Sequence, residues 1–390
     1  MTAYSVQAPH PEAGAPGTGS AGSAGSAGFA GTEEAAASEE SILLRLADLR
    51  GARVAVTGGG GLVGSRVVAL ARRAGAAVTV LDRFDAYPED VRGLFGLDRH
   101  DVDLVVGDVA DRETVRRLVK GADYVIHAAA YADVAACTRH PDVAFEANVR
   151  GTQTVLEEVA AAPVRRLVFI SSAAVYGNGR PGVTGPQVFQ EDQLLVPVSV
   201  YANTKLWAEH QARLMLGGPG RAECTVLRYF SVYGDPQVPK PGSHSWMVAW
   251  MAMHAHLGLP IRLNGGGVQV RDLVHVDDIA AATVLALVAE RAAGQVVNVA
   301  TGKPTSVREV ADRIAPHYPG SRRIVTPMPE GDPLGGYAST ERMREVLEFT
   351  PRIGVPEGVA RYVRWLSANP QAVPGWLAAE AAAALDGRAG

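Results

Sequence analysis

A glycine-rich junction between a predicted strand and a predicted helix constrains this chain more than any other feature. Residues 53–57 (RVAVT) form a short apolar β-rich run, and apolar residues follow with helical spacing over 61–74. At the junction, Gly58, Gly61 and Gly64 recur every three residues. Glycines let the backbone turn tightly and approach a diphosphate, while the helix N-terminus supplies amide donors. The junction therefore predicts a dinucleotide-binding α/β fold.

An acidic residue at the end of the next predicted strand supports this interpretation. Asp82 lies 18 residues beyond Gly64, where such folds carry the carboxylate that accepts hydrogen bonds from ribose hydroxyls. This carboxylate would repel a 2′-phosphate and so favours NAD over NADP, although the neighbouring cation Arg83 argues in the other direction. Because the chain holds 43 glycines, a purely structural glycine turn is the alternative interpretation.

Short β-rich runs alternate with helical stretches along most of the chain. The runs cover residues 53–57, 78–81, 104–106, 124–126, 167–170, 225–229 and 296–299, and the helical stretches cover 61–74, 112–119, 143–162 and 201–216. This alternation predicts an α/β fold with a Rossmann-type, doubly wound parallel sheet covered by helices on both faces. Stretches rich in proline and glycine, over 180–200, 234–245 and 326–337, predict a smaller C-terminal α/β domain built from insertions.

The chain is expected to divide into a tail, two domains and a C-terminal segment. We assign residues 1–41 to a disordered tail, 50–234 with 270–300 to an NAD-binding domain, 235–269 with 301–370 to a substrate-binding domain, and 371–390 to an alanine-rich helix or tail. Of the first 40 residues, 23 are Gly, Ala or Ser, five are glutamates and none is basic. Such a segment cannot bury enough apolar surface to offset its ordering entropy.

Composition excludes several functional classes. With 37 basic against 41 acidic residues the net charge is −4, so we expect no nucleic-acid partner. The two cysteines, Cys137 and Cys224, make neither a disulfide framework nor a zinc set, and His254 and His256 are spaced too closely to chelate a metal from one helix face. The longest apolar stretch, over 279–289, is about half a membrane span. We expect a cytoplasmic globular protein without a membrane or metal site.

A tyrosine and a lysine four residues apart head one predicted helix. Tyr201 and Lys205, in YANTK, share a helix face, so the ammonium can lie near the phenol. A tyrosine acting as a base near pH 7 needs its pKa lowered by about 3 units, or roughly 4 kcal/mol, which Lys205 and a positive nicotinamide ring could supply. YxxxK also occurs often by chance. Lysine is scarce in this chain, however, with only four present, so its presence here favours a site that needs a compact point charge.

A serine pair follows the predicted strand over 167–170. Ligands bind at the carboxyl ends of parallel strands, so Ser172 is placed to hydrogen-bond a substrate hydroxyl beside Tyr201. A Ser-Ser pair after a strand is also a common turn signal. The nucleophile elbow G-x-S-x-G is absent at this position, which argues against covalent serine chemistry.

Together, in this order, these motifs resemble the extended short-chain dehydrogenase/reductase family, within it the nucleotide-sugar epimerase/dehydratase group. The resemblance runs from about residue 51 to 366 and includes GDV at 107–109, HAAA at 127–130, NVRGT at 148–152, LRYFSVYG at 227–234, QVRDLVHVDD at 269–278 and NVATG at 298–302. It implies cofactor contacts from Gly58, Gly61, Leu62, Val63, Gly64, Asp82, Arg83, Asp108, Val109, Ala128, Ala129, Ala130, Asn148, Ser171, Lys205 and Phe230. It implies substrate contacts from Ser172, Tyr201, Ser231, Arg271 and Gly336.

What the motifs lack indicates the reaction. Dehydratases of this group carry an Asp-Glu pair directly after the active-site hydroxyl, and uronate decarboxylases place a glutamate nearby. Here both positions are alanine, Ala173 and Ala174, a pattern that resembles UDP-galactose 4-epimerases. By this resemblance Tyr201 takes the C4 hydroxyl proton, Ser172 bridges the sugar oxygen, and Lys205 holds the nicotinamide ribose. The alternatives are a dehydrogenase or ketoreductase acting on a nucleotide sugar or another secondary alcohol, and a non-catalytic NAD-binding scaffold.

Three departures from the family pattern put the sugar in doubt. Ser231 stands where epimerases usually carry asparagine, and Pro329 where a phosphate-binding arginine is usual. Gly336 replaces a residue that is a bulky tyrosine in some epimerases, so we expect a pocket for a larger or differently substituted sugar, and a specialised sugar pathway. The resemblance also implies a homodimer through the helices over 143–162 and 201–216. Glu191 and Asp192 are interpreted as a solvated loop near the cleft.

Overall fold

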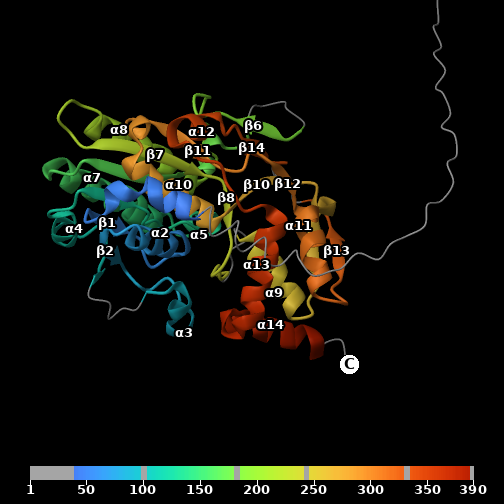
Figure 1. The fold of residues 1–390 in the computed structure, drawn as a ribbon. Helices are drawn as coiled ribbons and strands as arrows, with labels where there is room; N and C mark the ends of the chain where they lie inside the picture. Colours follow the sequence, from blue (N-terminus) through green and yellow to red (C-terminus); the bar gives the residue numbers. More distant parts are fainter. Residues whose placement is uncertain (1–38, 98–102, 180–184, 241–245, 329–333, 387–390) are drawn as a thin grey trace, which may run out of the picture. The chain divides into compact units, whose positions relative to one another are not determined.

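The computed structural model describes residues 39–97, 103–179, 185–240, 246–328 and 334–386 (Figure 1). The chain separates into two compact units, residues 1–44 and 45–390. Most of the expected tail, residues 1–38, lies outside the described part, and residues 39–41 are helical. Acidic Glu39 and Glu40 favour the first turn of this helix, because carboxylates stabilise helix N-termini.

The larger unit is built on one seven-stranded parallel sheet. Its strand order is β11-β7-β5-β4-β1-β2-β3, with every neighbouring pair parallel. The strands span Arg53–Thr57 (β1), Ala77–Asp82 (β2), Leu104–Val106 (β3), Tyr124–His127 (β4), Arg166–Ser172 (β5), Glu223–Tyr229 (β7) and Val296–Val299 (β11). All seven β-rich runs expected from the sequence are present, and the Rossmann-type α/β prediction is confirmed.

Helices pack on both faces of this sheet (Figure 1). Helices α2 (Leu62–Arg73) and α10 (Val276–Val288) pack together on one face, and α4 (Arg112–Val119), α7 (Gly151–Ala161) and α8 (Val200–Leu216) on the other. Burial on both faces explains why the central strands are almost wholly apolar. The long helix expected over 143–162 contains a break: α6 (Pro141–Ala144) passes into a π-helical segment, Phe145–Arg150, before α7 begins.

The remaining elements form small sheets and a second helical cluster. The small sheets pair β12-β10-β8, β13-β9 and β14-β6. Their strands span Gln187–Phe189 (β6), Ser231–Tyr233 (β8), Ile261–Asn264 (β9), Val270–His275 (β10), Pro304–Ser306 (β12), Arg323–Thr326 (β13) and Gly336–Ala338 (β14). The helices span Glu89–Arg92 (α3), Val134–Arg139 (α5), Met247–His256 (α9), Val307–Ile314 (α11), Glu341–Leu347 (α12), Val355–Ala368 (α13) and Gly375–Asp386 (α14).

Helices α9, α11 and α13 share an apolar core to one side of the main sheet (Figure 1). Met251 and Met253 of α9 and Tyr362 of α13 are buried in it. Residues 45–390 form a single compact unit, so the division into cofactor and substrate domains at residue 234 stays a prediction. In the described part of the chain no helix is long and apolar enough to cross a bilayer. The described residues also contain no cluster of histidine, cysteine and carboxylate side chains that could hold a metal ion.

Candidate functional site

The glycine loop between β1 and α2 leaves no room for side chains at Gly58 and Gly64. Gly58 has φ +74°, and a Cβ there would lie 2.5 Å from the amide nitrogen of Ala129. A Cβ on Gly64 would collide with the carbonyl oxygen of Gly58, and Gly61 caps α2 in extended conformation. Leu62 begins the helix. The loop therefore presents bare backbone amides at a helix N-terminus, as a diphosphate requires.

Asp82 ends β2 beside this loop. Its Oδ2 accepts a hydrogen bond from the Gly60 amide at 2.8 Å and its Oδ1 accepts one from the Phe84 amide at 2.7 Å. Burial raises the pKa of Asp82, and these two backbone hydrogen bonds oppose that shift. Arg83 forms ion pairs with Asp85 at 2.6 Å and with Asp108 at 3.5 Å. Because that guanidinium is already engaged by carboxylates, the arrangement favours a ribose with free hydroxyls over one bearing a 2′-phosphate.

Asn148, one of the expected cofactor residues, holds the backbone of a neighbouring segment. Asn148, in the π-helical segment, accepts from the Tyr131 amide at 2.7 Å and donates to the Tyr131 carbonyl and to Thr204 Oγ1, both at 3.1 Å. Both of its amide hydrogens are thus used, and the side chain is buried. These bonds let Asn148 fix the chain that follows Ala128–Ala130 at the end of β4, and its expected contact with the cofactor stays a prediction. A π segment at such a position is typical of functional sites.

Ser171, another expected cofactor residue, also has an internal partner. Its hydroxyl donates to Glu209 in the interior, and its expected contact with the cofactor stays a prediction. Glu209 also pairs with Arg228 at 2.7 Å, both side chains being at most 4% exposed. Arg228 donates in turn to the Tyr176 hydroxyl at 2.9 Å. The LRY motif at 227–229 signals this network only in part, because its partners lie far apart in the sequence.

The same network corrects the interpretation of Glu191. Its Oε1 accepts from the Asn298 amide at 2.9 Å, and its backbone carbonyl accepts from Arg228 at 3.1 Å. Tyr176 completes the ring by donating to Asn298 Oδ1 at 2.7 Å. Glu191 is buried rather than solvated. The network ties β5, β7 and β11 together directly beneath the site, where buried polar groups must be paired.

The predicted catalytic residues converge. Ser172, the last residue of β5, accepts from the Ala174 amide at 3.1 Å, and Tyr201, in the first turn of α8, hydrogen-bonds to Ser172. Lys205 Nζ donates to the Ile170 carbonyl at 2.8 Å and lies 6.0 Å from the Tyr201 ring centroid. The helical i, i+4 spacing thus brings phenol and ammonium to one face, as the sequence predicts.

Burial sets the electrostatics of this group. It raises the pKa of Tyr201 to about 12, against the opposing hydrogen bond from Ser172, and lowers the pKa of Lys205 to about 8. The expected lowering of the tyrosine pKa by Lys205 is therefore absent from the protein alone, because the phenolate loses its water. Only a further positive charge close to the phenol would favour its ionisation.

The expected substrate residues lie on the small sheets. Ser231 begins β8 and pairs with Leu273 of β10, and Arg271 of β10 donates to the Val270 carbonyl at 2.8 Å. Gly336 has a packing reason to be glycine: a Cβ there would collide with the Gln187 carbonyl, since β14 lies against β6. Its lack of a side chain thus makes room for a strand, which weakens the argument for an enlarged pocket. Pro329 lies outside the described residues.

The other expected cofactor contacts surround this site. Val63 lies in the first turn of α2, Val109 is buried against Gly151, and Phe230 packs on Tyr176 at a ring distance of 6.3 Å. His127, which sequence reasoning named only as part of a motif, is fully buried between Thr57 and Thr152. Burial lowers its pKa to about 3, so it remains neutral.

Comparison with known proteins identifies the family. The model of the NAD dependent epimerase/dehydratase family matches residues 54–300. The chain belongs to this family. Within it, the chain is 30% identical over 351 residues to UDP-glucose 4-epimerase 3 of Oryza sativa subsp. japonica, across 82% of this chain and 91% of that protein. It is also 27% identical over 329 residues to a UDP-N-acetyl-alpha-D-glucosaminuronate decarboxylase of Bacillus cytotoxicus, across 80% and 97%.

A solved structure of the family shows the same architecture. UDP-glucose 4-epimerase from Thermotoga maritima, with UDP-glucose, superposes with a TM-score of 0.73 at 27% identity, covering 82% of this chain and 99% of that one. As a member of the NAD-dependent family, this chain should hold the dinucleotide at its glycine loop. The bare Gly58 backbone and the paired Arg83 fit that cofactor.

Proposed function

We propose that this protein is an NAD-dependent 4-epimerase of a nucleotide-diphosphate sugar. The observation that carries the proposal is the immediate surrounding of Tyr201. The phenol hydrogen-bonds to Ser172. The methyl group of Ala174 packs against the apolar cluster that Tyr201 forms with Cys137 and Ala144. Elimination of water or loss of carbon dioxide needs a carboxylate acid or base beside the sugar, and alanine at 173 and 174 supplies none. Proton transfer at a hydroxyl needs only the tyrosine and serine.

The residues of the site divide the work of that reaction. Tyr201 accepts the proton of the C4 hydroxyl and later returns it to the 4-keto sugar, with Ser172 holding the sugar oxygen in line. NAD, when bound, supplies the hydride acceptor and a positive ring close to the phenol. Lys205 adds a second cation on the same helix face. Because the pKa of the buried Tyr201 is about 12 in the protein alone, Tyr201 becomes an effective base only once the oxidised cofactor is bound.

The substrate class follows from the relatives and from the cations of the small sheets. The Thermotoga maritima structure contains UDP-glucose. Arg271, half-buried on β10, is our candidate for the substrate diphosphate, which a guanidinium binds well. Ser231 offers a single hydroxyl for the sugar, and Gly336 follows Gly335, which forms a β-bridge with Val270 next to Arg271.

The test is an assay on candidate sugars. Incubating the protein with UDP-glucose, UDP-galactose and their N-acetylated and uronate counterparts, followed by proton NMR, should show C4 inversion without net NADH. We expect Tyr201→Phe to reduce turnover by about 10²-fold or more. Net NADH formation would instead indicate a dehydrogenase or ketoreductase, and pentose formation from a uronate a decarboxylase. Unchanged turnover in Tyr201→Phe would refute the catalytic assignment.

We also propose a homodimer. Phe145 at the start of the π segment is 55% exposed and Leu214 of α8 is 82% exposed, and the helices that carry them pack side by side. Pairing of these helices between two copies would cover both apolar side chains. Light scattering should give about twice the 40.9 kDa chain mass, and Leu214→Glu should weaken association, whereas a monomeric wild type would contradict the proposal.

A further inference from the structure

Lys240, one of only four lysines, occupies an unusual place. Its Nζ lies 4.8 Å from the ring centroid of Tyr87 and 6.0 Å from that of Trp246. Within the described part of the chain no carboxylate lies within 4.0 Å of it, so this cation contacts aromatic rings without an ion pair. Burial lowers the pKa of Lys240, while attraction to Asp133, Asp85 and Asp82 raises it.

The contacts of its loop bring this ammonium close to the glycine loop. Asp82 ends β2, and Asp133 follows the carboxyl end of β4 and caps α5. Strand β1 lies between β4 and β2 in the sheet, and the glycine loop follows β1. The Lys240 ammonium contacts the ring of Tyr87, which lies five residues beyond Asp82, and its loop is tied to Arg66 of α2 through Asp235, so it lies on the side of the sheet where β2 ends and α2 begins. A dinucleotide fold binds its diphosphate at that point.

Two further observations indicate that a partner belongs here. Asp133 is 7% exposed, its Oδ1 accepts from the Ala136 amide at 2.6 Å, and its Oδ2 is buried without a hydrogen-bond partner. A buried carboxylate oxygen of this kind calls for a hydrogen-bond donor, which a ribose hydroxyl of the dinucleotide can supply and the diphosphate, an acceptor only, cannot. In addition, Arg83 is engaged by Asp85 and Asp108. Among the described residues, Lys240 is a cation without an ion pair and so remains available to an anionic ligand.

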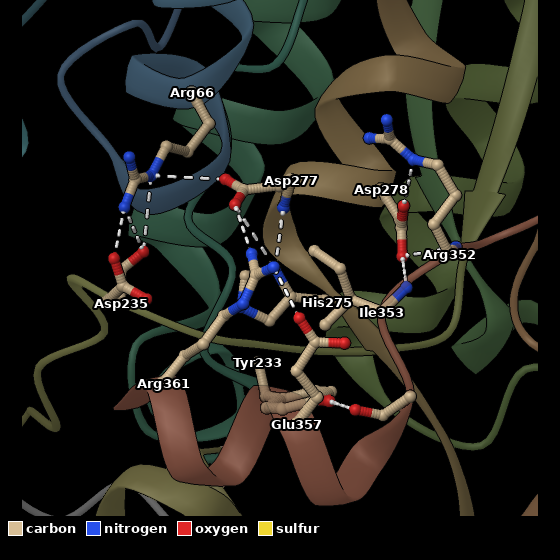
Figure 2. A network of polar contacts seen from close by, with 11 residues as sticks. Arg66, Tyr233, Asp235, His275, Asp277, Asp278, Arg352, Ile353, Glu357 and Arg361 are labelled. Carbon is tan, nitrogen blue, oxygen red and sulfur yellow. Dashed lines mark hydrogen bonds and ion pairs between the residues drawn. The ribbon is translucent and has the colours of Figure 1, made fainter. Parts of the chain in front are cut away.

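The loop that carries Lys240 is anchored to α2 by an ion pair. Arg66 of α2 donates to Asp235 Oδ2 at 2.5 Å and to its carbonyl at 2.8 Å, and Figure 2 shows this pair beside Asp277. Further along the loop, Tyr362 of α13 donates to the Gln237 carbonyl at 2.7 Å. Anchors at residues 235 and 237 leave little freedom to the chain that presents Lys240. The ammonium is therefore positioned before a ligand arrives, which reduces the entropy lost on binding.

We propose that Lys240 is a cofactor-binding residue that reaches from the 235–240 loop to the diphosphate of NAD. The diphosphate carries two negative charges, and the glycine loop meets them with neutral amides. An ammonium adds the full charge that the loop lacks. Tyr87 and Trp246 exclude water on one side of it, so the interaction is stronger than at an exposed site. The proposal rests on the NAD dependence of the family and is independent of the sugar or reaction.

The test compares ligands with and without phosphates. Protein stripped of cofactor is titrated with ADP-ribose and adenosine by competition against NADH fluorescence, for wild type, Lys240→Gln and Lys240→Arg. Lys120→Gln, at an exposed lysine, is the matched control. We expect Lys240→Gln to weaken ADP-ribose binding by about tenfold or more, to leave adenosine binding within about twofold, and to retain less NAD through purification. Lys240→Arg should preserve most of the ADP-ribose affinity, and Lys120→Gln all of it.

Several results would overturn the proposal. Equal weakening of adenosine and ADP-ribose binding would show that Lys240 only supports the ribose site at Asp82. Unchanged affinity for both ligands would show that the ammonium is not used in cofactor binding. Weakening of UDP binding with ADP-ribose unaffected would assign Lys240 to the substrate. Thermal unfolding of each variant distinguishes a fold defect, since Lys240→Arg keeps the charge and should restore binding.

Discussion

The buried lysine at position 205, our proposed catalytic cation, should cost the cofactor-free protein stability. Lys205 is 3% exposed, and burial lowers its pKa from 10.5 to about 8. Replacing it by methionine, which has similar length and no charge, removes the penalty of burying an ammonium. The change also removes a 2.8 Å hydrogen bond to the Ile170 carbonyl and a contact 5.1 Å from the Phe169 ring centroid. We therefore expect Lys205→Met to be inactive but at least as stable as the wild type near pH 7.

The pH dependence gives the magnitude. A group whose folded pKa lies below its unfolded value binds fewer protons when folded, so stability rises with pH between the two values. With a lowering of about 2.5 units, the charged lysine costs the wild type about 3 kcal/mol below pH 8, and nothing above pH 10.5. Between pH 7 and pH 9.5 the wild type should gain about 2 kcal/mol relative to Lys205→Met.

Urea unfolding of the cofactor-free proteins at several pH values measures this gain. Comparing each variant with the wild type at the same pH cancels the titration of all other groups. Lys120→Met, at an exposed position, should show a difference from wild type that stays constant with pH. A Lys205→Met difference that is also independent of pH would refute the argument that burial dominates the energetics of this lysine.

Three further predictions follow from the site. Gly58→Ala would place a Cβ 2.5 Å from the Ala129 amide nitrogen at φ +74°, so we expect at least a tenfold loss of NAD affinity by calorimetry. Unchanged affinity would contradict the binding of NAD at the glycine loop. Glu209→Gln should destabilise the fold by about 3–5 kcal/mol in urea because Arg228 keeps a buried charge, while a Glu209→Leu, Arg228→Met double variant should recover most of that loss. Since burial lowers the pKa of His127 to about 3, its contribution to stability is lost as pH falls from 6.5 toward 3, by up to about 1.4 kcal/mol per pH unit. His127→Gln should make the free energy of unfolding depend less on pH in this range. Equal pH dependence of the variant and the wild type would contradict this assignment.

Sequence reasoning succeeded where the signal is local. The seven strands follow from short buried apolar runs, and the glycine loop from three spaced glycines between a strand and a helix. The meeting of Tyr201 with Lys205 follows from helical geometry alone. Each of these features depends on residues a few positions apart, whose relative placement the backbone periodicity fixes.

The sequence failed where a residue's role depends on a distant partner. It did not show the internal partners of Ser171 and Asn148, whose side chains bond to Glu209 and to the Tyr131 backbone. Glu191 looked like part of a polar loop, but its carboxylate caps the amide of Asn298, more than a hundred positions away. The scarcity of lysine was the one available signal for Lys240, and it was applied only to Lys205.

The sequence by itself determined the fold class, the dinucleotide loop and the tyrosine–lysine pair, because these arise from repeating backbone geometry and from the absence of side chains at glycine. Only the tertiary structure decided which charges are paired and which remain available. Folding pairs Arg83 with Asp85 and Arg228 with Glu209, and it leaves Lys240 against aromatic rings without an ion pair to any described residue. Charge pairing depends on distances between segments far apart in the chain and on their burial, and neither is encoded in local spacing.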